Sequence, residues 1–313
     1  MKIVIFGGGG FIGSAIVDRL LMDGHDLRIF ERPRVEPYRK FSESERIAWI
    51  FGDMLSINDI TLALSGMDLV IHLVSTTLPK NSNEDPIYDV QSNLVGTLQI
   101  LNVMVKLNIG KIVFISSGGT VYGTPQYLPI DECHPCNPQV SYGITKLAIE
   151  NYLRLYENLH GIKTLILRVA NPFGKRQRIE TAQGAVSVFL HRAISGQAIN
   201  IWGDGSVTRD YIYIDDVAEA FARAINYEGQ KRIFNVSQGL GTNLNELIAF
   251  IEETLGYPVE KNYLPARDLD VSKNILSNKL LHHEMGWAPK ISIREGIKLT
   301  AEWMIKEIKA QPE

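Results

Sequence analysis

The chain contains very little cysteine: among its 313 residues only Cys133 and Cys136 are of this type, in the segment ECHPCNP. A four-ligand zinc site needs a second pair of ligands, and the sequence has no second cysteine pair. The surrounding prolines and asparagine are typical of a loop rather than of the helix start that carries a redox-active pair. We therefore expect two loop cysteines and no metal site.

The chain also lacks an excess of positive charge. Lysine and arginine number 32 against 35 aspartates and glutamates, which gives a net charge of -3. This balance argues against nucleic acid as a partner, and no basic run suggests a membrane surface. No stretch approaches the roughly 20 apolar residues that a membrane span requires. The first residues resemble a signal peptide, but four consecutive glycines and the pair Asp18-Arg19 argue against one, so we expect a cytoplasmic protein.

What the chain does have is an alternation of short apolar runs with longer amphipathic stretches. The strands lack strict polar–apolar alternation and are separated by helices, which predicts an α/β fold with a doubly wound parallel sheet. The predicted strands are 2–6, 26–30, 68–74, 111–117, 163–171 and 233–237. The predicted helices are 13–24, 93–108, 141–161, 215–227 and 243–256.

The pattern loosens after Asn171. The segment GDGSVTRD (203–210) is predicted to be a turn-rich connector, whereas the apolar run 233–237 looks like one more buried strand. We predict a large nucleotide-binding domain over residues 1–171, with a return segment at about 211–237. Residues 172–210 and 238–313 are predicted to form a smaller C-terminal substrate-binding lobe.

A glycine-rich turn, GGGGFIG, follows the first predicted strand and opens the first predicted helix. Gly7, Gly10 and Gly13 allow a tight turn and a close approach of the backbone to a pyrophosphate, which the helix N-terminus then attracts. A glycine turn without a ligand is the alternative, but the strand before it and the helix after it are what a Rossmann dinucleotide-binding domain requires. The sequence therefore predicts a bound dinucleotide.

The choice between NAD and NADP depends on Glu31, which ends the second predicted strand 18 residues beyond Gly13. A carboxylate there accepts hydrogen bonds from a ribose 2′-hydroxyl and repels a 2′-phosphate, which favours NAD. Arg32 and Arg34 weaken the preference for NAD, because a guanidinium can bind the 2′-phosphate of NADP. The alternative for these two arginines is that they belong to a solvated loop. Asp53 follows a third expected strand and is a candidate for contact with the adenine.

A second motif, SYGITK, places Tyr142 and Lys146 four residues apart, hence on one face of a predicted helix. Tyrosine ordinarily ionises near pH 10, so it is a poor base at neutral pH. We expect a nearby ammonium and a positively charged nicotinamide ring to lower the pKa of Tyr142. It can then take a hydroxyl proton while a hydride leaves the same carbon. The alternative for this spacing alone is a solvated helix face.

Together these residues resemble the extended short-chain dehydrogenase/reductases of the nucleotide-sugar epimerase/dehydratase group, and most of all the UDP-galactose (UDP-glucose) 4-epimerases. The resemblance spans nearly the whole chain, through GGGGFIG, GDM, SSGGTVYG, YGITK, LRVANPFG, WGDGSVTRDYIYIDDVAEA and LGWAPKISIREGI. It implies an NAD-dependent UDP-hexose 4-epimerase. The cofactor-binding residues it implies are Gly7, Gly10, Phe11, Ile12, Gly13, Glu31, Arg32, Asp53, Met54, Leu73, Asn93, Ser116, Tyr142 and Lys146.

The chain departs from the epimerase pattern at one catalytic position. The family places a strand-end hydroxyl four residues before the tyrosine of VYG, and here that residue is Gly118. The nearest hydroxyls that could replace the missing one are those of Ser117, which we slightly favour, and Thr120. The alternatives are that a water occupies the space left by Gly118, or that this space widens the pocket. Gly119 and Thr120 stand where dehydratases and decarboxylases of the group carry carboxylates, so elimination is disfavoured and oxidation followed by re-reduction at C4 remains.

The resemblance also implies the substrate contacts. The diphosphate of the substrate is held, in the family, by residues that match Asn171, Arg209 and Arg267. An arginine suits this role because its forked N–H donors bind phosphate oxygens. For either arginine, the alternative is a salt bridge on the surface or between the lobes. Asn274 stands where glucose-only enzymes carry a bulky tyrosine, and a smaller side chain there favours admission of N-acetyl sugars. Asn93 matches an asparagine that holds the helix bearing Tyr142.

Two rival functions remain at this stage. One is a nucleotide-sugar reductase or dehydrogenase with net turnover of the cofactor, and the other is a non-catalytic NAD-binding regulator. Regulators of this kind usually lose the tyrosine or the lysine, and both are present here. The resemblance further implies a homodimer built on the helices around 93–108 and 142–158.

Overall fold

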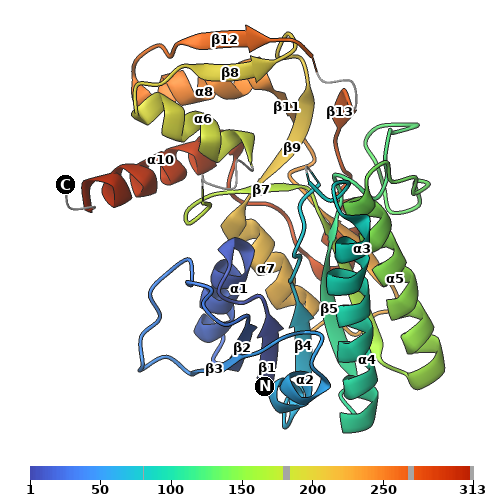
Figure 1. Ribbon diagram of the computed structural model, residues 1–313. Helices are drawn as coiled ribbons and strands as arrows, with labels where there is room; N and C mark the ends of the chain where they lie inside the picture. Colours follow the sequence, from blue (N-terminus) through green and yellow to red (C-terminus); the bar gives the residue numbers. More distant parts are fainter. Residues whose placement is uncertain (80, 179–183, 267–270, 311–313) are drawn as a thin grey trace.

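A seven-stranded parallel sheet forms the centre of the computed structural model, which describes residues 1–79, 81–178, 184–266 and 271–310. The strand order is β10-β6-β5-β4-β1-β2-β3, and every neighbouring pair is parallel. This confirms the predicted doubly wound sheet (Figure 1). Its strands are β1 (Lys2–Phe6), β2 (Asp26–Glu31), β3 (Ile47–Phe51), β4 (Leu69–His72), β5 (Lys111–Ser117), β6 (Lys163–Val169) and β10 (Ile233–Val236).

The sheet is hydrophobic on both faces, as strand β1 illustrates. Ile3 and Ile5 belong to one buried cluster, and Val4 and Phe6 belong to a second one. Side chains of a strand alternate between the two faces, so a continuous apolar run is what a sheet covered on both sides requires. All four side chains are fully buried.

Helices cover both faces of the sheet (Figure 1). Helix α1 packs against α7 on one face, and α4 packs against α2 and α5 on the other. A π-helix, η1, directly precedes α4, so the predicted helix 93–108 begins inside it. The bounds are α1 (Phe11–Met22), α2 (Ile57–Leu64), α3 (Pro86–Asp89), η1 (Val90–Val95), α4 (Gly96–Leu107), α5 (Ser141–His160) and α7 (Ile214–Ala224).

In the smaller part of the molecule, the described residues form two small sheets and four helices. In one sheet β9 lies between β11 and β13 and also pairs with β7, and in the other β12 pairs with β8. The predicted connector 203–210 is wrong at its end, because Thr208–Asp210 already belong to β9. The strands are β7 (Asn171–Phe173), β8 (Ile199–Trp202), β9 (Thr208–Tyr213), β11 (Gly241–Asn243), β12 (Lys261–Leu264) and β13 (Lys273–Asn274). The helices are α6 (Ala185–Ile194), α8 (Leu244–Leu255), α9 (Lys279–Met285) and α10 (Ile293–Ala310).

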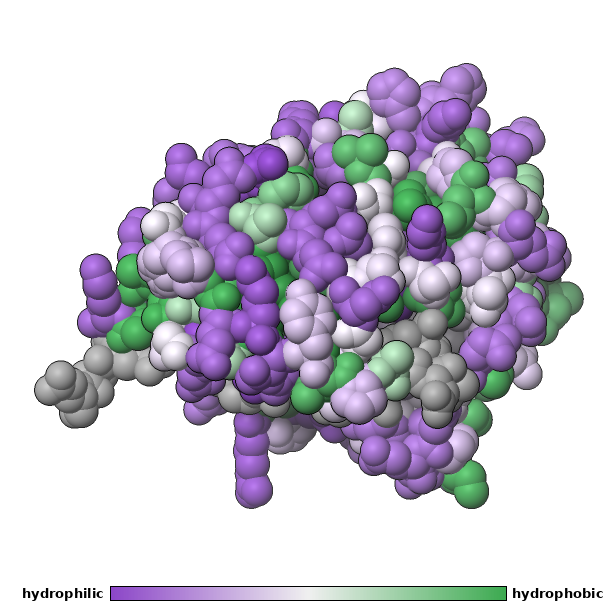
Figure 2. Space-filling view, turned by 90° about the horizontal axis from the view of Figure 1, so that it is seen from above, coloured by the Kyte–Doolittle hydropathy of each residue, from purple (hydrophilic) through white to green (hydrophobic). Residues whose placement is uncertain are grey.

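The chain crosses between the two parts more than once. After β9, helix α7 returns to the large sheet, and β10 pairs with β6 as its edge strand. The exact division into domains stays a prediction. Seen from above, hydrophilic side chains separate the hydrophobic groups of the described residues into small patches (Figure 2). Among the described residues, no helix has the length and apolar character needed to cross a bilayer.

Candidate active site

The glycine turn after β1 leaves no room for side chains at two of its positions. Gly7 has a φ of +86°, and a Cβ at Gly13 would lie 2.1 Å from the carbonyl oxygen of Gly7. Glycine alone fits both constraints. Gly10 caps helix α1 without a side-chain acceptor, and Phe11 begins the helix, so N–H groups of the first turn are left for an anion. These features fit a dinucleotide pyrophosphate.

Glu31 lies against this turn from the end of β2. Its Oε1 accepts a hydrogen bond from the Gly9 N–H at 3.0 Å, and burial raises the pKa of its carboxyl group. The loop beyond folds back to the same place, since the Tyr38 N–H donates to the Gly9 carbonyl at 2.8 Å. Arg32 and Arg34 are exposed, as a solvated loop would be. Contact of Glu31 with a ribose stays a prediction.

The remaining residues of the expected cofactor site follow the neighbouring strands. Asp53, after β3, is exposed, and its Oδ1 accepts from the Leu55 N–H at 2.9 Å. Met54 is buried, and its side chain touches the position that a Cβ on Gly96 would occupy. Leu73, after β4, and Ile12, in the first turn of α1, are half-buried. All these residues lie at the carboxyl edge of the sheet, where ligands of open α/β sheets bind.

Tyr142 and Lys146 occupy the first turns of α5, on one face as expected. The Lys146 ammonium lies 5.7 Å from the centre of the Tyr142 ring and donates to the Ile115 carbonyl of β5 at 3.1 Å. Burial lowers the pKa of Lys146 to about 8, against the opposing charges of Asp89 and Glu150. The lysine is thus fixed between the sheet and the tyrosine.

In the protein without a bound cofactor the pKa of Tyr142 lies above its ordinary value. Burial raises this pKa to about 12, and a hydrogen bond with Ser75 opposes the rise only in part. The negative charge of Asp89 adds to it. The fall expected from Lys146 together with a bound nicotinamide ring stays a prediction.

The hydroxyls at the end of β5 have different surroundings. Ser116 donates to Oε1 of Glu150, which also binds the Arg168 guanidinium at 3.0 and 2.6 Å through its two oxygens. Ser117, the last residue of the strand, is half-buried. Thr120 Oγ1 is buried and has no hydrogen-bond partner among the described residues. Ser116 is therefore engaged in a buried ion-pair cluster, whereas Ser117 is accessible.

Gly118 is closed off by a side chain from the other part of the molecule. A Cβ at position 118 would lie 2.3 Å from Cδ1 of Leu276 and 3.3 Å from the carbonyl oxygens of Arg168 and Val169. Leu276 is fully buried. The two expectations of a water in this space and of a wider pocket are therefore wrong, because a leucine methyl group fills it.

Three of the four expected substrate residues lie on one small sheet. Asn171 of β7 donates to the Asp210 carbonyl at 3.0 Å, and Asn274 of β13 pairs in register with Arg209 of β9. Arg209 donates to the Val271 carbonyl at 2.6 Å. Asn274 Nδ2 donates to the Gly118 carbonyl at 3.3 Å, and its buried Oδ1 has no partner among the described residues. Arg267 lies outside the described residues.

Sequence reasoning missed a polar cluster beneath Tyr142. Asp89 is fully buried and accepts hydrogen bonds from Thr77 and Asn93 at Oδ1 and from Ser141 and Thr145 at Oδ2. Asn93 in turn accepts from the Thr76 N–H at 2.9 Å. Asn93 thus reaches α5 through Asp89, and its role of holding that helix stays a prediction. The contacts join residues up to 56 positions apart, so no local pattern predicts them.

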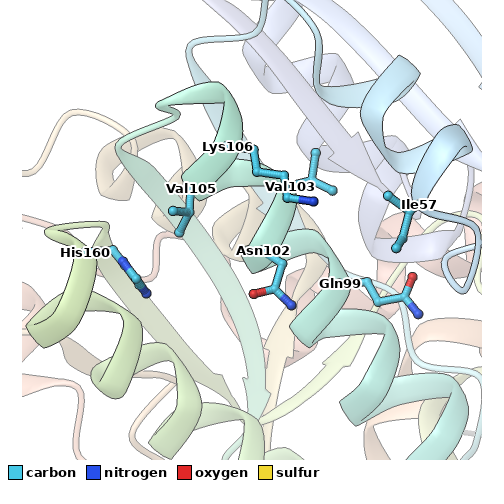
Figure 3. A pocket seen from close by; sticks show the side chains of 7 residues that line it. All are labelled: Ile57, Gln99, Asn102, Val103, Val105, Lys106 and His160. Atoms are coloured by element: carbon cyan, nitrogen blue, oxygen red, sulfur yellow. The ribbon is translucent and has the colours of Figure 1, made fainter.

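Two cavities lie away from these residues. One, of about 260 Å³, opens between α4, the start of α2 and the end of α5 (Figure 3). It is lined by Ile57, Gln99, Asn102, Val103, Val105, Lys106 and His160. Cys133 and Cys136 are free thiols, and the described parts of the chain contain no cluster of three or more metal-ligating side chains.

Comparison with known proteins identifies the family. Residues 3–237 match the model of the NAD dependent epimerase/dehydratase family. A UDP-glucose 4-epimerase of Mycolicibacterium smegmatis is 36% identical over 97% of this chain and 98% of its own. The structure resembles the Thermotoga maritima UDP-glucose 4-epimerase with UDP-glucose, at a TM-score of 0.93 and 32% identity over 98% of this chain and 100% of that one. It also resembles the Thermus thermophilus UDP-glucose 4-epimerase complex with NAD. There the TM-score is 0.90 and the sequence identity is 31%, over 97% of this chain and 99% of that one. The chain belongs to the NAD dependent epimerase/dehydratase family.

Proposed function

We propose that the protein is an NAD-dependent UDP-hexose 4-epimerase. The observation that carries the proposal is the pair of half-buried Tyr142 and buried Lys146 at the carboxyl edge of the sheet, in a chain whose glycine turn fits a dinucleotide. The relatives named as UDP-glucose 4-epimerases, two of them with solved structures, support the choice of substrate.

In this proposal Tyr142 exchanges a proton with the sugar O4. NAD, when bound at the glycine turn, supplies a hydride acceptor for the sugar C4 that also returns the hydride, so the reaction has no net redox change. Lys146 holds an ammonium near the tyrosine ring, and that charge favours the phenolate. The phenolate takes the O4 proton and the phenol later returns it. Ser117 is the hydroxyl proposed to bridge the sugar O4 and Tyr142, because it is the accessible one.

The residues at 118–120 argue against the elimination reactions of the same group. Removal of the C5 proton and loss of the C6 hydroxyl need an acid and a base, and Gly118, Gly119 and Thr120 offer no carboxyl group. We propose that Asn171, Arg209 and Arg267 hold the diphosphate while the 4-keto sugar turns over in the pocket. Asn274 is proposed to leave room for an N-acetyl group.

We further propose a homodimer formed through α5 and its neighbours. Helix α5 carries the exposed apolar side chains Ile144, Tyr152, Leu155 and Leu159, and Leu159 is 65% exposed. Exposed apolar residues grouped on one element are typical of an interaction surface. The cavity of Figure 3 opens beside the same helix.

The test is incubation of the purified protein, without added cofactor, with UDP-glucose and separately with UDP-N-acetylglucosamine. Proton NMR would resolve the C4-inverted products, and inversion of either sugar supports the proposal. Turnover only with added NADPH would refute it and indicate a reductase. The variant Tyr142→Phe should lose roughly 10²- to 10⁴-fold in rate and keep its NAD. Wild-type protein that binds NAD without inverting either sugar would contradict the proposed activity.

A further inference from the structure

The catalytic helix α5 begins without a cap of its own. Its N-cap residue is Val140, whose side chain offers no acceptor. The first N–H groups are instead bound by the segment before α3: Ser141 N–H donates to Asn83 at 2.8 Å, and Tyr142 N–H donates to Ser82 at 3.0 Å. The backbone of Tyr142 is therefore placed by a segment about 60 residues earlier in the chain.

Asp89 is the centre of this arrangement. It is fully buried and makes no ion pair with any described residue, yet it accepts four side-chain hydrogen bonds. Two come from Ser141 and Thr145 on α5, at 2.7 Å each. A buried carboxylate without a cation is costly unless it is fully hydrogen-bonded, and its place at the N-terminus of a 20-residue helix also favours its charge.

Of the other two bonds to Asp89, one comes from Asn93 of η1 and one from Thr77 in the segment after β4. Thr77 donates to Asp89, and Ser75 Oγ donates to the Thr77 carbonyl at 3.1 Å. The Ser75 hydroxyl in turn acts on Tyr142, whose pKa it lowers. Asp89 thus holds the start of α5 directly, through Ser141 and Thr145, and is connected through Thr77 to Ser75.

We propose that Asp89 is a positioning residue that fixes Tyr142 for proton exchange with the sugar. The proposal rests on the proposed epimerase activity for its kinetic readout. Its charge acts on both members of the pair, because it raises the pKa of Tyr142 and that of Lys146. The other titratable groups around the pair are Glu150, which raises the pKa of Lys146, and His72, which burial keeps neutral with a pKa of about 3.

The test compares Asp89→Asn with Asp85→Asn, a matched change four residues away. Asp85 is exposed and caps α3, a position where asparagine serves as well as aspartate. We expect Asp89→Asn to lower kcat roughly 10- to 100-fold with little change in KM or in retained NAD, because misplacement of a reacting group costs rate rather than binding. Asp85→Asn should match the wild type.

Ionisation of Tyr142 gives a readout that needs no turnover. The phenolate absorbance of each protein, minus that of its Tyr142→Phe derivative, follows this residue alone. Loss of the Asp89 charge should move the ionisation to lower pH, and Asp85→Asn should not move it. An unchanged kcat in Asp89→Asn, or a fall in kcat without this shift, would overturn the proposal. If the wild type shows no epimerisation, the proposed function fails, and the absorbance still decides the role of Asp89.

A second pair keeps the test valid if Asp89→Asn does not fold. Thr145→Val removes one donor to Asp89, and Thr145→Ser keeps it. We expect the valine variant to lose kcat and the serine variant to retain it. Equal rates in the two variants would overturn the proposal.

Discussion

A single methyl group added at position 118 tests whether Leu276 fills the place of the missing hydroxyl. In Gly118→Ala the new Cβ would lie 2.3 Å from Leu276 Cδ1, whereas carbon atoms pack at about 3.5–4.0 Å. Leu276 must retreat by more than an ångström, and it is fully buried. Such overpacking costs about 1–3 kcal/mol of the free energy of unfolding.

The neighbouring glycine supplies the control. A Cβ at Gly119 would meet its nearest atom, Ser117 Oγ, at 3.9 Å, which is ordinary contact, and neither Gly118 nor Gly119 has a positive φ. Gly119→Ala should therefore change stability by no more than about 0.5 kcal/mol. Denaturant unfolding of both variants measures the difference.

A double-mutant cycle then assigns the cost to Leu276. Leu276→Ala alone should destabilise by about 2–5 kcal/mol, because it leaves a cavity. The methyl group of Gly118→Ala partly fills that cavity, so the double variant should be more stable than the sum of the singles predicts, by about 1–2 kcal/mol. Additive effects, or a Gly118→Ala variant as stable as Gly119→Ala, would refute the reasoning.

Three further predictions concern the site. Ser117→Ala should lower kcat about 10²-fold or more and Thr120→Val far less, because the Thr120 hydroxyl is inaccessible; the reverse order would identify Thr120 instead. Glu150→Gln should lower the free energy of unfolding in urea by about 3–5 kcal/mol, because it leaves the buried Arg168 guanidinium without an opposite charge. A decrease of less than about 1 kcal/mol would contradict this prediction. Burial lowers the pKa of Lys146 from 10.5 to about 8. Between pH 8 and 10.5 the unfolded chain therefore binds more protons than the folded one, and the free energy of unfolding rises with pH. Lys146→Met should flatten that rise, and an unchanged slope in this variant would contradict the prediction.

The sequence predicted well those features that depend on local pattern. Strands β1 and β5 begin and end where the apolar runs 2–6 and 111–117 do, and α5 differs from its predicted range by one residue. The glycine turn and the Tyr142–Lys146 spacing likewise need only a few consecutive residues to be recognised. These elements carry most of the candidate site.

What the sequence did not predict depends on distant contacts. β13 has two residues, and its existence depends on pairing with β9, so no local pattern predicts it. The predicted connector 203–210 likewise missed the start of β9 at Thr208. Leu276 reaches Gly118 from more than 150 positions away, and Asp89 gathers donors from three segments. The rise in the pKa of Tyr142 in the protein without its cofactor was not predicted either, because burial, which dominates it, is a property of the folded chain.

The edge position of β10 has a consequence for biosynthesis. β6 pairs with β5 on one side and with β10 on the other, yet β10 follows β6 by roughly 70 residues, which take about 4 to 14 s to synthesise at 5–20 residues per second. During that interval the nascent sheet has an unpaired, apolar edge, which is a template for wrong pairing between chains. Ribosome-bound chains that stop before Ile233 should therefore be the species on which chaperones act.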